Sequence, residues 1–325
     1  MSLTASLDQP HANFTPGLIA ALIAVIFWGL QLPLAKSAMG PDGFDPYTLS
    51  SIRYGLAALP LLLYWFFISR HAEAHDTVWP ERWAVLRLGM GWMALSPLCV
   101  FVGLGMTLPE QAAIIIALQP TMMAVVNWLK NGVRPARFTL GCIVVALFGV
   151  VCVVTKLQPL AALTPRYMLG ASLVFFGALF WVLYTQGAAH YHHWPSLKLT
   201  TFTLSGCAVT MAIANGSALA IGAAHWPSGA LIGQWWPTLL FLGLGGVLLA
   251  MLLWTRGVKR IGALNALLLL NLVPVLTFAV RFAQGARFAP VELFGAALVV
   301  GALVANNLHA RREHQRVMLV ALKAA

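Results

Sequence analysis

Ten apolar segments follow one another along this chain, and each is near the roughly 20 residues that a helix needs to cross a bilayer. Only 9% of the residues are charged, against about 25% in soluble domains, so too few polar side chains remain to cover a water-facing globule. The chain is therefore predicted to be an all-α integral membrane protein. Its expected spans are 16–39, 45–69, 82–105, 109–129, 136–156, 167–189, 197–221, 231–254, 262–282 and 290–310.

The fourth and ninth spans each carry a proline near the middle, with a polar residue ahead of it. Pro120 follows Gln119, and Pro274 lies three residues after Asn271. A proline cannot donate to the carbonyl four residues back and crowds it, so each helix should kink or open there. In lipid the freed carbonyl is costly unless other helices or a water-lined cavity satisfy it. Pro120 and Pro274 are predicted to be helix kinks or hinges.

The sequence also contains an internal repeat. A shift of 154 residues places Pro120 on Pro274, and a shift of 153 places Trp28 on Trp181. The same two shifts align further pairs: Phe27 with Phe180, Gly17 with Gly170, Gly89 with Gly243, Gly91 with Gly245, Gly103 with Gly257, and Gly141 with Gly295. Each copy holds five spans, and because five is odd the second copy must lie upside down relative to the first. Inverted repeats of this kind are a signature of secondary transporters, whose substrate site lies near the midplane between the repeats.

The predicted architecture is thus ten transmembrane helices, arranged as two inverted five-helix repeats around a central cavity. The repeats are expected at 16–156 and 166–310, between an N-terminal tail at 1–15 and a basic C-terminal tail at 311–325 that suits a helix on the membrane surface. No cleavable signal peptide is expected.

The net charge of +11 comes from basic residues in short loops, which is a topology signal and favours no nucleic-acid partner. If the N-terminus is cytoplasmic, most Lys and Arg lie on the inner side, and the outer side holds Lys36, Lys156, Arg166, Arg281 and Arg287. The positive-inside rule therefore predicts that both termini are cytoplasmic. The protein is expected in the inner (plasma) membrane.

The residues resemble the EamA domain of the drug/metabolite transporter superfamily. The resemblance rests on Phe27-Trp28-Gly29, Lys36, Arg53, the A-A-x-x-x-A-L-Q-P pattern that ends at Pro120, and the glycines of the fifth span, Gly141 and Gly149. It covers nearly the whole chain in two copies. It implies ten helices in inverted repeats that work by alternating access, commonly to export amino acids, metabolites or drugs.

One turn departs from the family pattern. The family often has an acidic residue just after the fourth helix, where this chain has Lys130 and Asn131. A role of that acid in gating is therefore not expected here.

Several aromatic and amide side chains are candidates for the substrate site. Trp28 and Gln31 share a helical face, and Trp181 and Tyr184 repeat that spacing in the second copy. An aromatic ring beside a hydrogen-bonding group suits a partly apolar solute, and cation–π contact is available to an amine. The predicted substrate-binding residues are Trp28, Gln31, Trp92, Gln119, Trp181, Tyr184, Trp254 and Asn271. The alternative for each is helix packing or lipid contact.

Arg53 is the one candidate for a charge inside the membrane. Such a residue is usually paired or faces a cavity. It could hold a substrate carboxylate, cap backbone carbonyls, or reach the outer interface by snorkelling.

The nine carboxylates all lie outside the middle of the expected spans, with Glu110 and Glu292 at helix starts. Ion-coupled carriers commonly place Asp, Glu or His in the membrane core. We therefore expect facilitated transport or weak coupling. No phosphate-binding G-x-x-x-x-G-K-[ST] loop is present, so ATP hydrolysis by that route is excluded.

Neither a metal nor a cofactor is expected. The H-Y-H-H cluster at His190, His192 and His193 has no second set of ligands, and the four cysteines lie in apolar segments without forming a C-x-x-C pair.

The predicted function is that of a secondary transporter rather than an enzyme, moving an amino acid, a metabolite or a drug-like amine outward by alternating access. Its partners would be the small solute and membrane lipid, with a homodimer possible through a small-residue face at Ala297, Gly301 and Ala305. The alternatives are an importer or exchanger of a sugar-derived metabolite, a membrane enzyme, and a non-transporting scaffold.

Overall fold

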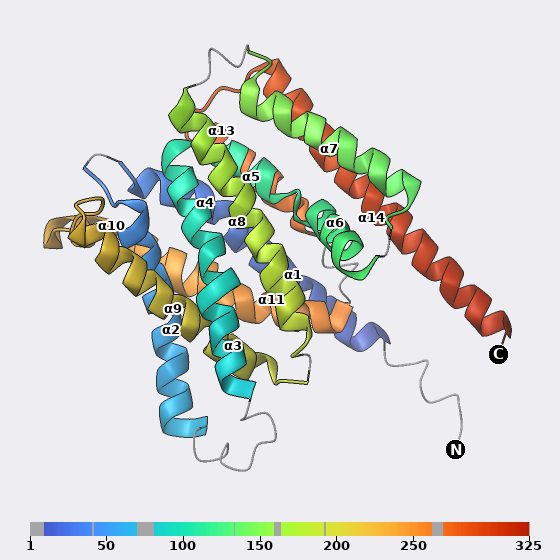
Figure 1. The fold of residues 1–325 in the computed structure, drawn as a ribbon, viewed down its shortest axis with the longest axis horizontal. Helices are drawn as coiled ribbons and strands as arrows, with labels where there is room; N and C mark the ends of the chain where they lie inside the picture. Colours follow the sequence, from blue (N-terminus) through green and yellow to red (C-terminus); the bar gives the residue numbers. More distant parts are fainter. Residues whose placement is uncertain are drawn as a thin grey trace.

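The computed structural model describes residues 10–40, 42–69, 81–132, 134–158, 164–191, 193–261 and 269–324, whose regular structure is helical apart from one isolated bridge (Figure 1). The first repeat comprises α1 (Pro10–Ala38), α2 (Pro46–Tyr64), η2 (Trp65–Ser69), α3 (Arg82–Leu88), η4 (Gly89–Met93), α4 (Ala94–Met106), α5 (Pro109–Ile116), α6 (Gln119–Asn131) and α7 (Arg137–Thr155). The second comprises α8 (Pro165–Ala189), α9 (Ser196–Ala220), α10 (Gly229–Leu240), η6 (Phe241–Leu249), α11 (Ala250–Ile261), α13 (Leu272–Ala283) and α14 (Pro290–Ala324). The elements labelled η are π-helical.

The described residues contain nine stretches that are long and apolar enough to cross a membrane. They include the continuous rods α3–η4–α4 and α10–η6–α11, and α5 and α6 together make one span. The ninth expected span, 262–282, lies partly outside the described residues, and its described part contains the short apolar helix α13. The all-helical membrane architecture in two repeats is thus confirmed.

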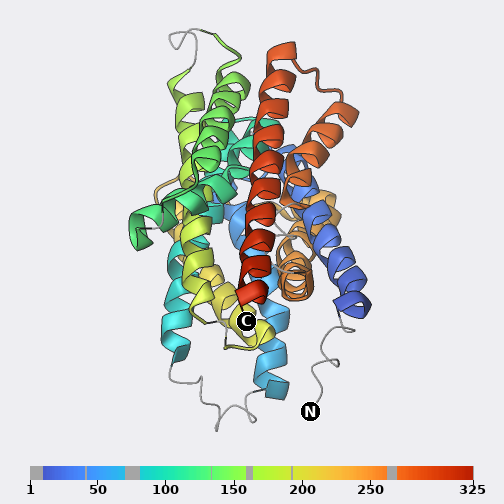
Figure 2. The same ribbon diagram turned by 90° about the vertical axis from the view of Figure 1, so that its right-hand side faces the viewer.

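The two repeats run in opposite directions, and the first helix of each packs against the other repeat. In Figure 2, α1 begins at the lower end of the bundle, whereas its counterpart α8 begins at the upper end. The first helix of each repeat packs against the third span of the other, as α1 against α11 and α8 against α4. Each repeat therefore completes the interior of the other, and the space between them lies at the centre of the bundle.

Close helix contacts occur where aligned glycines fall. A Cβ on Gly103 of α4 would lie 2.5 Å from the carbonyl oxygen of Gly170 of α8. At the equivalent contact in the other half, a Cβ on Gly257 would lie 2.8 Å from the Cβ of Ala21. Small residues let the backbones approach at this distance, so packing between the repeats explains the glycines at these two contacts.

Charged side chains at one end of the bundle satisfy helix ends and pair with each other. The ammonium group of Lys36 donates to the carbonyl oxygens of Leu104 and Gly105 at 2.6 and 3.1 Å, capping the last turn of α4. Arg281 of α13 pairs with Glu110 of α5 at 3.1 Å, which ties the second repeat to the first. The contacts of Lys36, Arg281 and Glu110 thus explain their positions at this end of the bundle without a role in the cavity.

Glu292 has a similar role at the start of α14. Its carboxylate accepts from the backbone N–H of Ala289 at 2.8 Å and pairs with Lys156 at 3.1 Å. A negative charge in the first turn also interacts favourably with the positive end of the helix dipole.

The C-terminal tail differs from the separate surface helix that its composition suited. Here α14 runs without a break from Pro290 to Ala324 (Figure 1). The physical reason is local: after Gly301 the sequence contains no proline or glycine that would end the helix.

The contact between α7 and α14 offers a test of the packing. A Cβ on Gly149 would lie 2.6 Å from the carbonyl oxygen of Gly295, whereas a Cβ on Gly141 of the same helix meets nothing within 4 Å. We expect Gly149→Ala to lower the melting temperature in detergent, with about 1–3 kcal/mol lost to overpacking. Gly141→Ala is the matched control and should be neutral or slightly stabilising. Equal melting temperatures for the two variants would contradict the close packing of α7 on α14.

Candidate functional site

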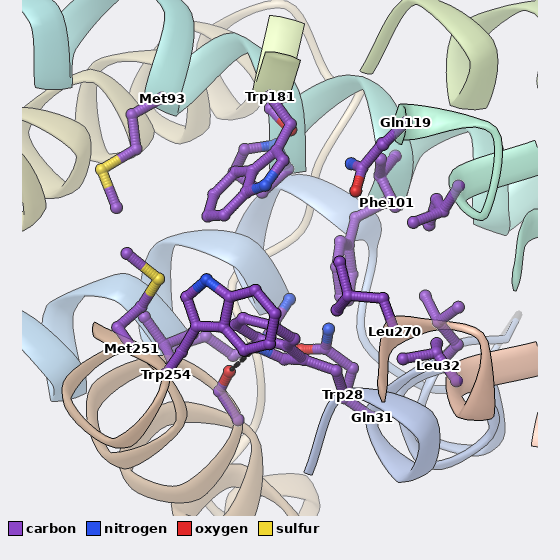
Figure 3. A pocket seen from close by; sticks show the side chains of 18 of the residues that line it. Trp28, Gln31, Leu32, Met93, Phe101, Gln119, Trp181, Met251, Trp254 and Leu270 are labelled. Carbon is purple, nitrogen blue, oxygen red and sulfur yellow. Dashed lines mark hydrogen bonds between the residues drawn. The ribbon is translucent and has the colours of Figure 1, made fainter. Parts of the chain in front are cut away.

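A cavity of about 140 Å³ lies between the two repeats. Its wall includes residues of α1, α2, α4, α8 and α11, both π-helical segments η4 and η6, and the broken helix α5–α6 (Figure 3). The volume is close to that of the roughly 150 Å³ engineered protein cavity that holds benzene. The cavity as it stands therefore has room for a group of about one aromatic ring.

Three tryptophans form opposite walls of this cavity. Trp28 of α1 and Trp254 of α11 pack together with ring centroids 5.2 Å apart. Trp181 of α8 points toward them from across the space, as Figure 3 shows. The indole N–H of Trp28 donates to the carbonyl oxygen of Gly246 at 3.2 Å, which fixes the plane of its ring. The aromatic walls are thus held in place before any solute enters.

The π-helical segments η4 and η6 occupy matching positions in the two repeats and reach the cavity from both sides. Gly89 and Gly91 of η4 align with Gly243 and Gly245 of η6 at the shift of 154 residues. Met93 at the end of η4 and the Gly246 region of η6 line the cavity. Wide turns of this type are frequent at functional sites. Here the carbonyl of Gly246 serves as the acceptor for Trp28.

The proline-containing helix of the first repeat is interrupted beside the cavity. α5 ends at Ile116, a turn follows at Ala117, and α6 begins at Gln119 with Pro120 in its first turn. Ile116, Ala117, Gln119 and Pro120 all line the cavity. The break that Pro120 imposes on this helix therefore lies next to the cavity.

The equivalent break in the second repeat lies at Asn271, just before α13. Leu270 and Val273 line the cavity there, whereas Pro274 and Asn271 are buried outside its wall. The amide nitrogen of Asn271 has no hydrogen-bond partner within the described ranges. Whether either break acts as a hinge stays a prediction.

Arg53 lies in the cavity wall and is 1% exposed, so it does not reach the membrane interface. Its Nη2 donates to Oε1 of Gln31 at 2.9 Å, and its guanidinium carbon lies 3.9 Å from the ring centroid of Phe101. Its Nε and Nη1 have no hydrogen-bond partner among the described residues. Of the three roles considered from sequence, snorkelling and carbonyl capping do not describe this geometry.

The structure brings five of the eight predicted substrate-binding residues to the cavity wall: Trp28, Gln31, Gln119, Trp181 and Trp254. The other three lie elsewhere. Tyr184 is buried behind Trp181, with ring centroids 5.3 Å apart, and its hydroxyl donates to Thr203. Trp92 is 42% exposed and stacks on Phe180 outside the cavity. Substrate contact by the five wall residues stays a prediction.

Several wall residues escaped sequence reasoning, although the repeat could have located them. At a shift of 154 residues, cavity-lining residues pair with one another: Met93 with Val247, Pro97 with Met251, Val100 with Trp254, Ile116 with Leu270, and Gln119 with Val273. Applying the shift to each predicted site residue would have added the aligned residue of the other repeat as a further candidate. Phe101 and Leu32 have no such signal, because an apolar side chain in an apolar helix reveals nothing about the direction it faces.

The histidine cluster belongs to a shallow surface site at the opposite end of the bundle from Lys36. His193 Nε2 and the indole N–H of Trp194 both contact Glu81 Oε2 at 2.9 Å. The hydrogen bond from Trp194 is the main reason that the pKa of the Glu81 carboxyl lies below its usual value. His192 lies outside the described residues, and within the described ranges no group of three His, Cys, Asp or Glu side chains could hold a metal ion.

Inverted repeats, broken helices and a central cavity are features of multi-pass membrane transporters. The model of the EamA-like transporter family matches residues 15–155 and 168–308, most of the chain, so the chain belongs to this family.

Two proteins of Bacillus subtilis (strain 168) are similar over nearly their whole lengths. The uncharacterized transporter YrdR is 28% identical, over 93% of this chain and 94% of its own. The uncharacterized transporter YyaM is 29% identical, over 87% of this chain and 91% of its own. A solved crystal structure shares the fold with a TM-score of 0.63, covering 92% of this chain and 99% of its own at 22% identity.

The placement of the tryptophans gives a test of the site. In a thermal-shift screen with amino acids, amines and sugars, a bound solute stabilises the protein by mass action. We expect a compound that raises the melting temperature of the wild type to lose its effect in Trp181→Ala. Trp92→Ala removes a tryptophan outside the cavity and should keep the effect. A shift retained in Trp181→Ala and lost in Trp92→Ala would place the site at the surface instead.

Proposed function

We propose that this protein is a secondary carrier that moves a small organic solute across the membrane by alternating access. The observation that carries the proposal is the meeting of both repeats at one central cavity, with irregular backbone from each repeat beside it. Irregular backbone at this depth is tolerated only where it is buried in protein or lines a cavity.

The chemistry of the cavity wall supports binding and offers little for catalysis. The described residues that line it include no carboxylate, histidine or cysteine, so they supply no acid–base pair, thiol nucleophile or metal-ligand set. Aromatic and aliphatic side chains with a few polar groups are typical of a ligand site. A carrier therefore fits better than the membrane enzyme that the sequence left open.

Access to the cavity would alternate through relative motion of the two repeats. At the end that carries Lys36, the repeats are joined by the Arg281–Glu110 pair and by a contact of 3.4 Å between Gln284 Nε2 and Ser37 Oγ. Both contacts join helices of different repeats, so they must break if this end opens. The helix break before Pro120 gives α5 and α6 a point about which they can move separately.

The proposal places this end outside the cell, because the basic residues are concentrated at the other end and mark it as cytoplasmic. The protein would then lie in the inner membrane with both termini in the cytoplasm. Outward movement of the solute is the direction that the family resemblance favours.

A flux assay in proteoliposomes tests the carrier proposal and the role of Pro120 together. We expect Pro120→Ala to slow solute flux several-fold while the melting temperature changes little, since alanine closes the break that the alternation uses. Pro60→Ala is a matched control, because Pro60 lies within α2 on its exposed face. Unchanged flux in Pro120→Ala would reduce the proline to a packing feature.

The same vesicles test coupling. Because the described wall residues include no carboxylate or histidine, an imposed pH gradient should give little uphill accumulation. Strong accumulation driven by the gradient would show that a proton relay has been overlooked.

A further inference from the structure

The two repeats contribute residues to the cavity wall at aligned positions, but the side chains that they contribute differ in polarity. Its amide, hydroxyl and guanidinium groups all come from the first repeat, among them Gln31, Arg53, Ser96 and Gln119. The described residues that the second repeat contributes are Trp181, Gly246, Val247, Met251, Trp254, Leu270 and Val273, which are aromatic, aliphatic or glycine. The amide, hydroxyl and guanidinium groups that a solute can meet in this cavity therefore all belong to one repeat.

The repeat shows that this polarity is an addition to the common plan. At the shifts of 153 and 154 residues, Arg53 aligns with Gly206 and Cys207, and Gln119 aligns with Val273. Helix packing is satisfied in the second repeat without either polar group. Arg53 and Gln119 therefore need a reason that the shared fold does not supply.

Arg53 carries an uncompensated positive charge in the cavity wall. It is the only charged side chain among the described residues that line the cavity, and none of the ion pairs between described residues includes it. Within the described part of the chain its Nε and Nη1 are without partners, as the hydrogen bond to Gln31 uses Nη2. Buried guanidinium N–H groups without acceptors are costly, and an anion supplies both the acceptors and the missing charge.

We propose that the transported solute is a small organic anion whose carboxylate pairs with Arg53 and whose apolar body lies between Trp181 and the Trp28–Trp254 pair. This inference rests on the proposed carrier function and names its substrate class. A solute whose only charge is an ammonium group is disfavoured, because the described cavity wall has a cation and no carboxylate to meet it.

The route to Arg53 involves two neighbours. Phe101 covers the guanidinium face at 3.9 Å and the Nε and Nη1 atoms are buried, so Phe101 has to turn aside before a carboxylate reaches them. Gln31 is a positioning residue, since its Oε1 holds Nη2 at 2.9 Å and fixes the direction of the remaining N–H groups. Both neighbours are uncharged and leave the positive charge for the solute.

Three probes with the same phenyl body test the proposal: phenylacetate, phenylacetamide and 2-phenylethylammonium. Calorimetric titration of the purified protein should give phenylacetate a Kd at least about tenfold below that of phenylacetamide, as expected for a hydrogen bond between charged groups. The ammonium probe should bind weakest. In Arg53→Gln the preference for the carboxylate over the carboxamide should fall to about one.

Controls separate charge recognition from folding. Arg256→Gln removes an exposed arginine of α11 and should keep the wild-type preference. Arg53→Met removes an unpaired buried charge, so it should melt no lower than the wild type and should also lose the preference. This second variant keeps the test decisive if Arg53→Gln does not fold.

Three results would overturn the proposal: tighter binding of the ammonium probe than of the carboxylate, a preference that survives in both Arg53 variants, or no binding of any probe to the wild type. Failure of the carrier function looks different. In that case the probes bind with the expected charge preference, but proteoliposomes show no flux of phenylacetate.

Discussion

The requirement that backbone polar groups stay out of contact with lipid organises this molecule. A regular helix meets that requirement by itself, but a proline break leaves a carbonyl without its usual donor, so such a break must be buried in protein or face a cavity. The structure places the break between α5 and α6 at the central cavity, beside the π-helical segments η4 and η6. The break that would be costly in lipid is thus part of the candidate site.

A second constraint is that neither repeat can close the cavity alone. α1 packs on α11 and α8 packs on α4, so each repeat supplies a helix to the other half. The indole of Trp28 in the first repeat is held by the carbonyl of Gly246 in the second, and Thr277 of the second donates to the carbonyl of Gly29 in the first. Motion of one repeat against the other would therefore reshape both walls of the cavity together.

Much of the fold was predictable, because span length, the order of spans and the shift between Pro120 and Pro274 are properties of the sequence itself. Trp28 and Trp181 could be proposed for the site since the repeat aligns them. The direction in which a side chain faces could not be predicted: Trp92 has a similar apolar setting, yet it lies on the surface. Asn271 likewise looked equivalent to Gln119, and the structure turns it away from the cavity wall.

The central claim is that this cavity opens to the two sides of the membrane in turn. Gln119→Cys, made after the four free cysteines are replaced, should react with an impermeant maleimide added from either side of the membrane. Cross-linking Ser37→Cys to Gln284→Cys, whose native side chains lie 3.4 Å apart, would lock one end of the bundle. After cross-linking, we expect the reagent to reach position 119 only from the opposite side. Equal labelling from both sides after cross-linking, or none from either side before it, would contradict alternating access at this cavity.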